Sequence, residues 1–153
     1  MRVKEYITEL DDSKKNVVRE IRSYEIEFAA LKNPEGLYQM AKKLRIDRRA
    51  EEFVYAIAVD SANIPMGIFE VSHGNINQSI ISPREIFVRL LLIGASNFFL
   101  LHNHPSGNTS PSKEDVAVTK RISDVGKLMN LQLLDHLIIG VNDYRSLRED
   151  GVL

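Results

Sequence analysis

The chain has 153 residues, a formal net charge of −1 and no cysteine. Its length suits one compact core, because single domains cluster at about 100 to 150 residues. With 20 basic and 21 acidic residues, it offers no bulk electrostatic attraction to nucleic acid or to an anionic membrane. The lack of cysteine excludes a disulfide framework, a thiolate zinc site and a cysteine nucleophile, so any metal site must use His, Asp and Glu.

The N-terminal segment is charged throughout and has no apolar run of the kind found in signal peptides. No stretch approaches the roughly 18 apolar residues that a membrane-spanning helix needs. We therefore expect a soluble, cytoplasmic protein. Residues 1–15 are expected to form a polar arm or a short helix, and residues 17–28 a strand. This places an N-terminal arm and strand at residues 1–30 and the main domain at residues 31–153.

The next segments predict a helix and then a hairpin. Asn33 can cap a helix that begins at Pro34, and apolar residues share one face of residues 34–44. Residues 52–60 are almost continuously apolar, which is typical of a strand buried on both faces. A turn then leads to a partner strand at residues 64–74.

A second helix is expected after Ser82. Ser82, Pro83 and Glu85 match a helix start with a capping box, and Gly94 suits the left-handed position that ends a helix. The short apolar run at residues 97–101 then predicts a strand that leads into a histidine-containing segment.

Residues 113–130 have apolar side chains at helical spacing, with Asn130 as the stop, and residues 131–140 predict another strand. The order of helices and strands predicts one mixed α/β domain, with a central β-sheet flanked by helices.

The segment HNHPSGNTSPSKED, residues 102–115, combines metal-ligand residue types with a forced turn. On a strand, His102 and His104 project from the same face, with Cα atoms about 6 to 7 Å apart. The chain then folds back to a helix that begins near Ser112 and carries Asp115 on its first turn. Two nitrogens and one oxygen can hold one ion and leave a fourth tetrahedral position for water, as in catalytic zinc sites.

The same residues also have a structural explanation. Ser112 and Asp115 are spaced as in a capping box, so both can simply satisfy the first amides of the helix. Pairs of histidines two residues apart also occur in strands without a metal. The coincidence of the histidine pair, the turn and the Ser-x-x-Asp spacing favours the metal site.

The pattern His102-x-His104-Pro105, followed by Ser112-x-x-Asp115, resembles the JAMM signature of the MPN+/JAB metallopeptidases. The form HNHPSG with PS-x-x-D is similar to the RadC branch of that group. The resemblance covers about residues 52–150, is weaker from about Val17 onward, and implies the JAB/MPN fold with its cytidine-deaminase-like arrangement. Further similar segments are PREI at residues 83–86, LDHLIIG at residues 134–140, and His73-Gly74 with Asn77.

The resemblance also implies a role for each residue of the motif. His102, His104 and Asp115 would bind zinc, and Ser112 would hydrogen-bond the tetrahedral intermediate. RadC-like chains carry a catalytic glutamate at the start of the first core strand, eight residues before an aspartate. Glu52 occupies that position here.

Other glutamates are weaker candidates for the proton carrier. Glu51 would face the opposite way from Glu52 in a strand, Glu70 can be an ordinary exposed carboxylate, and Glu85 already has a capping role. Glu52 itself can also be a solvated charge at a strand end.

Two further histidines lie outside the motif. His136 follows Asp135 in a predicted strand, where neighbouring side chains face opposite sides. We interpret His136 as a core histidine that can contact the metal-site loop. His73, beside Gly74 in a turn, is expected to be structural or exposed.

The chain departs from longer RadC proteins at its N-terminus. Those proteins carry an upstream helix-hairpin-helix region, a DNA-binding type of module. The first fifty residues here are too short and too little basic to supply it. The resemblance is therefore to a short form, and this weakens the case for a direct role in DNA repair.

Three functional hypotheses follow. The leading one is a zinc-dependent metallohydrolase, a peptidase or isopeptidase that uses a metal-activated water and Glu52 as proton carrier. Two histidines and one carboxylate also fit the facial triad of non-haem iron oxygenases. The third is a non-catalytic domain that binds a partner or nucleic acid. The missing cysteines exclude a cytidine-deaminase type of zinc site.

The sequence does not identify the substrate. The apolar helix at residues 86–93 is compatible with a homodimer.

Overall fold

The computed structural model describes residues 1–27, 30–74 and 81–153. It contains three α-helices, a short 3-10 helix at Ile46–Arg48 and seven strands within those ranges. In chain order the main elements are β1 (Arg2–Leu10), β2 (Asn16–Glu25), α1 (Pro34–Lys43), β3 (Phe53–Val59), β4 (Pro65–His73), α2 (Pro83–Leu92), β5 (Asn97–Asn103), α3 (Lys113–Leu128), β6 (Gln132–Ile139) and β7 (Tyr144–Ser146).

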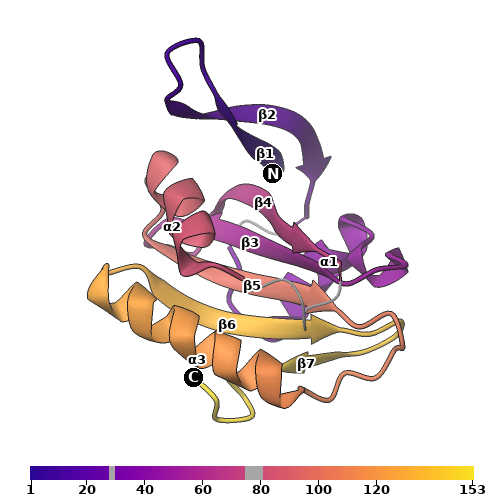
Figure 1. Ribbon diagram of the computed structural model, residues 1–153. Helices are drawn as coiled ribbons and strands as arrows, with labels where there is room; N and C mark the ends of the chain where they lie inside the picture. Colours follow the sequence, from indigo (N-terminus) through magenta and orange to yellow (C-terminus); the bar gives the residue numbers. More distant parts are fainter. Residues whose placement is uncertain (28–29, 75–80) are drawn as a thin grey trace.

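The strands form one mixed sheet in the order β2-β1-β4-β3-β5-β6-β7. Strand β3 pairs antiparallel with both β4 and β5, whereas β5 and β6 run parallel and are connected through α3. Strands β1 and β2 form an antiparallel hairpin, and β1 runs parallel to β4. The N-terminal hairpin therefore extends one edge of the sheet, at the top of Figure 1.

The sheet separates two hydrophobic cores. Helix α1 packs on one face, and α2 and α3 pack on the other, so the domain has three layers (Figure 1). Consecutive side chains of β3 alternate between the two cores, as expected for a central strand buried on both faces. On the α1 side these are Tyr55, Ile57 and Val59, and on the other side Val54, Ala56 and Ala58.

The mixed α/β fold and most of the predicted elements are confirmed. Asn33 caps α1 by accepting a hydrogen bond from the Gly36 amide at 2.9 Å. Gly94, just after α2, has a φ of +68° in the left-handed region. Strand β3 and its hairpin partner β4 lie where the apolar pattern placed them.

The expected arm or short helix at residues 1–15 is wrong, because Arg2–Leu10 is a strand. Its inward face carries Val3 and also Glu5, which is only 7% exposed. The Tyr24 hydroxyl donates to the Glu5 carboxylate at 2.6 Å, which offsets the cost of burying that charge. A buried acid in an otherwise charged segment hides the alternation that would have predicted the strand.

One smaller expectation also fails. Ser82 precedes α2, but its side chain makes no capping hydrogen bond, and Glu85 instead pairs with Arg89 at 3.1 Å. The short strand β7 was not predicted.

The apolar face of α2 packs largely against the rest of the domain, because Ile86, Phe87 and Leu90 are buried. No helix in the described part of the chain combines the length and apolarity needed to span a bilayer.

Candidate metal centre

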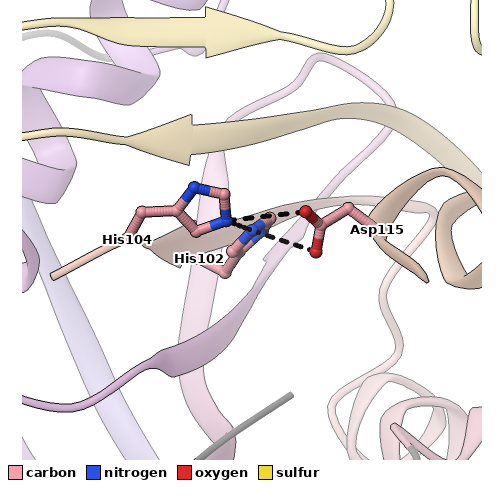
Figure 2. Close-up of side chains that lie close together, drawn as sticks. All are labelled: His102, His104 and Asp115. Carbon is pink, nitrogen blue, oxygen red and sulfur yellow. Dashed lines mark hydrogen bonds and ion pairs between the residues drawn. The ribbon is translucent and has the colours of Figure 1, made fainter. Parts of the chain in front are cut away.

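His102, His104 and Asp115 point toward one another at the end of β5 (Figure 2). The two Nε2 atoms are 3.0 Å apart. His102 Nε2 lies 3.3 Å from Asp115 Oδ1, and His104 Nε2 lies 3.5 Å from Asp115 Oδ2. His102 and Asp115 are buried, and His104 is half-buried. The group that the sequence pattern predicted is therefore brought together by the fold.

Strand pairing and a tight loop place the two histidines. Residues 102 and 104 project from the same face of β5, toward α3. The His104 amide donates to the Ile139 carbonyl at 3.0 Å, which fixes the start of the loop against β6. His104 Nδ1 lies 2.6 Å from the Asn108 carbonyl, within the loop itself. The imidazole of His104 is thus held by its own loop.

The first turn of α3 places Asp115. Ser112 is the N-cap and forms a complete capping box with Asp115. The Ser112 amide and hydroxyl each donate to Asp115 Oδ2 at 2.7 Å, and the Asp115 amide donates to Ser112 Oγ at 3.0 Å. The capping explanation is therefore confirmed, and it is compatible with a role of Asp115 as a metal ligand. The cap orients the carboxylate, whose two oxygens still face the histidines.

The electrostatics of the group differ from one residue to the next. Burial opposes ionisation of Asp115, but hydrogen bonds from His104 and Ser112 hold the pKa of Asp115 well below its ordinary value. The hydrogen bond to Asp115 raises the pKa of His104. Burial, reinforced by the neighbouring His136, lowers the pKa of His102 far below its ordinary value.

The residues present fit a metal ion. The Asn108 carbonyl can only accept, so His104 Nδ1 carries a proton and, in the neutral ring, the Nε2 lone pair faces Asp115. For a tetrahedral ion with bonds of about 2.0 to 2.1 Å, ligand atoms lie about 3.3 to 3.4 Å apart. The observed separations of 3.0, 3.3 and 3.5 Å match that spacing. A cation would relieve the repulsion among donors that are packed this closely.

Glu52 lies next to this group. β3 and β5 pair with Val54 opposite His102, and the same register continued by two residues sets Glu52 opposite His104. In agreement, the negative charge of Glu52 contributes to raising the pKa of His104. Glu52 also lines an open pocket of about 430 Å³ together with Glu51, Gly74 and Pro105. Glu52 is therefore near His104 and also lines a pocket that is open to solvent.

Of the other glutamates, Glu70 and Glu85 are paired elsewhere, whereas Glu51 lies beside Glu52. Glu51 is exposed and also lines the pocket. Glu70 lies 3.1 Å from His73 Nδ1, and Glu85 pairs with Arg89. The expectation that His73 is exposed is confirmed, while Asn77, one of the residues similar to RadC proteins, lies outside the described residues.

His136 is buried and contacts His102, as its interpretation as a core histidine near the site predicted. Its Nε2 lies 2.7 Å from His102 Nδ1. Burial lowers the pKa of His136 to about 4. The neighbouring Asp135 faces the other way, where its carboxylate accepts hydrogen bonds from the Ser146 hydroxyl and the Arg148 amide.

Sequence reasoning missed two residues that support the site. Thr119, one turn after Asp115 on α3, is buried and contacts His136. Asn103 lies between the two histidines and faces the opposite side of the sheet. Its side chain accepts a hydrogen bond from the Phe53 amide at 2.8 Å and donates one to the Glu51 carbonyl at 2.9 Å. Through these two hydrogen bonds, Asn103 fixes the backbone on both sides of Glu52. Helical spacing from Asp115 was a signal for Thr119, but nothing local marks Asn103.

The sequence matches a known family. A family model of the RadC-like JAB domain matches residues 31–152. A UPF0758 protein of Clostridium acetobutylicum is 45% identical over 103 residues, which are 67% of this chain and 45% of that protein. A UPF0758 protein of Pelobacter propionicus is 41% identical over 111 residues, which are 72% of this chain and 48% of that protein.

A further UPF0758 protein, from Clostridium botulinum, is 43% identical over 103 residues, which cover 67% of this chain and 45% of the relative. The chain spans about half the length of these curated relatives. Since the family model covers most of the chain, we conclude that this protein belongs to the RadC-like JAB domain family.

Proposed function

We propose that this protein is a zinc-dependent metallohydrolase of the JAMM type that cleaves an amide or isopeptide bond. The observation that supports it is the convergence of His102, His104 and Asp115 on one point, with Glu52 close enough for its charge to raise the pKa of His104. Two nitrogens and one carboxylate are a usual ligand set of catalytic zinc and leave one position open. Membership of a JAB family supports the same class.

Zinc, when bound, would lower the pKa of a water and polarise the substrate carbonyl. The protein's own part begins with Glu52. Its carboxylate takes one proton from the attacking water and passes it to the leaving amine nitrogen as the C–N bond breaks. The half-buried position of Glu52 beside the open pocket gives the carboxylate access both to solvent and to the site.

Ser112 is proposed to stabilise the substrate oxygen as negative charge develops on it. In the structure its hydroxyl donates to Asp115 Oδ2, so it must turn to serve the substrate. The Ser112 amide donates to the same oxygen at 2.7 Å, and the carboxylate therefore keeps a donor when the hydroxyl turns away.

The test compares Glu52→Gln with Glu51→Gln, which removes a neighbouring charge that lines the same pocket. Each protein is loaded with zinc and incubated with a mixture of peptides and lysine-linked isopeptides, and the products are identified by mass spectrometry. We expect Glu52→Gln to lower kcat about 10²- to 10⁴-fold while zinc stays bound, and Glu51→Gln to keep kcat.

The outcomes separate the hypotheses. Loss of zinc in Glu52→Gln would make Glu52 a ligand or a structural residue instead of the proton carrier. Hydrolysis that is equally fast in both variants would remove Glu52 from the mechanism. A protein that retains iron and not zinc would support oxygenase chemistry, and the absence of hydrolysis by the zinc-loaded wild type would favour a binding function.

A further inference from the structure

A chain of buried hydrogen bonds lies behind the ligand His102. His102 Nδ1 is 2.7 Å from His136 Nε2, and His136 Nδ1 is 2.7 Å from the Thr119 hydroxyl. The Thr119 hydroxyl is in turn 2.6 Å from the main-chain carbonyl oxygen of Asp115. Thr119, His136 and His102 are at most 1% exposed, so water does not compete for these bonds.

The Asp115 carbonyl at one end of this series of hydrogen bonds determines which group donates in each of them. A carbonyl oxygen can only accept, so the Thr119 hydroxyl proton lies on the Asp115 side of its oxygen. Thr119 Oγ1 must then accept from His136, which places a proton on His136 Nδ1. A neutral imidazole carries only one proton, so His136 Nε2 accepts and His102 Nδ1 donates.

His136 is neutral for a reason that is independent of these hydrogen bonds. It is 1% exposed, and an isolated charge at such a position would be strongly unfavourable. The carboxylate of its neighbour Asp135 binds Ser146 and Arg148 on the other side of β6 and does not compensate a charge on the ring.

We propose that Thr119 and His136 are positioning residues that fix the tautomer of His102, so that its Nε2 presents a lone pair to the metal. His104 reaches the same state by a different route, through the Asn108 carbonyl of its own loop. The helix that carries Asp115 therefore also prepares His102. This role concerns metal binding and does not depend on which bond the protein cleaves.

The first test uses the metal-free wild-type protein at neutral pH. Long-range proton–nitrogen correlation in NMR spectra distinguishes a protonated ring nitrogen from a bare one. We expect protons on Nδ1 of both His102 and His136 and bare Nε2 atoms. A proton on His102 Nε2 would overturn the proposal, and this measurement involves no substitution that can impair folding.

The second test compares Thr119→Val with Thr119→Ser. Valine has nearly the shape of threonine but cannot accept from His136, whereas serine keeps the hydroxyl. We expect Thr119→Val to raise the zinc Kd about 10- to 100-fold, measured by competition with a chelator, and to add a population of His102 protonated at Nε2. Thr119→Ser should stay close to wild type in both measurements.

A folded Thr119→Val protein that binds zinc as tightly as wild type would refute the proposal. Should Thr119→Val fail to fold, His136→Gln provides the same test, because a side-chain carbonyl can still accept from His102 Nδ1 and should preserve more zinc affinity than His136→Leu. Wild-type protein that binds zinc without hydrolysing any substrate would refute the proposed function and leave this role of Thr119 and His136 intact.

Discussion

Protonation of His104 would compete with a metal ion at the candidate site. Its hydrogen bond to Asp115 raises the pKa of His104 above the ordinary value of 6.5. The pKa values of His102 and Asp115 are both shifted well downward, so these two ligands carry no competing proton at neutral pH. Below the pKa of His104, a proton on Nε2 must leave before an ion can bind.

We therefore predict that zinc affinity is constant above the pKa of His104 and falls about tenfold per pH unit below it. The measurement is the zinc Kd, by competition with a chromophoric chelator, between about pH 5 and pH 8. Glu52→Gln should move the break to lower pH, because the charge of Glu52 helps to raise the pKa of His104. A Kd that does not change with pH would place the ion at other residues.

The loop between β5 and α3, which begins with His104, packs closely against the end of β6. Gly140, the residue after β6, is buried. A Cβ there would first meet the Asp143 carboxylate, and it would also lie 2.8 Å from Thr109 Cγ2 and 2.9 Å from the Gly107 carbonyl oxygen. The latter two atoms belong to the loop whose Asn108 carbonyl holds His104. Displacing the loop would therefore move a ligand.

We predict that Gly140→Ala weakens zinc binding and lowers the free energy of unfolding by about 1 to 3 kcal/mol. Chemical denaturation and the zinc Kd measure the two effects. Gly36→Ala is the matched control, since a Cβ at Gly36 in α1 meets only Asn33 Oδ1 at 3.4 Å and Leu31 Cδ2 at 3.9 Å. That substitution should leave stability unchanged or raise it by about 0.5 to 1 kcal/mol. Normal zinc binding by Gly140→Ala would contradict the account of the loop.

At the level of elements, the sequence predicted those whose signals are local. Helix α1 has a capping asparagine and a proline at its start, and β3 is an unbroken apolar run. Strand β1 has neither, and it is stabilised by distant partners, the hairpin strand β2 and a parallel contact with β4. Its buried Glu5 accepts a hydrogen bond from Tyr24, nineteen residues away, and lies opposite Arg22 of β2. Such a pairing cannot be inferred from local periodicity.

The site shows the same division at the scale of the whole molecule. His102, His104 and Asp115 lie within fourteen residues, so spacing alone could predict them. The position of Glu52 beside His104 follows from the pairing of β3 with β5, and the contact of His136 with His102 from the parallel pairing of β5 with β6. Resemblance to a family indicated Glu52. The contacts that Asn103 and Thr119 make with the site are evident only in the three-dimensional arrangement of the strands and α3.

Because the site draws on β3, β5, β6 and α3, a metal ion would connect the centre of the sheet with the helix that covers it. Binding to the folded state alone stabilises that state. The central claim is that His102, His104 and Asp115 together form a metal centre in this folded domain.

The most direct test is the metal content of protein purified without added metal or chelator, measured by inductively coupled plasma mass spectrometry. Asp115→Ala removes the ligand, and Asp124→Ala is the control, because Asp124 lies on the same helix with a side chain that is 75% exposed. We predict about one zinc per chain in wild type and in Asp124→Ala, and loss of zinc in Asp115→Ala. Wild-type protein that contains no metal and takes up no added zinc would contradict the account.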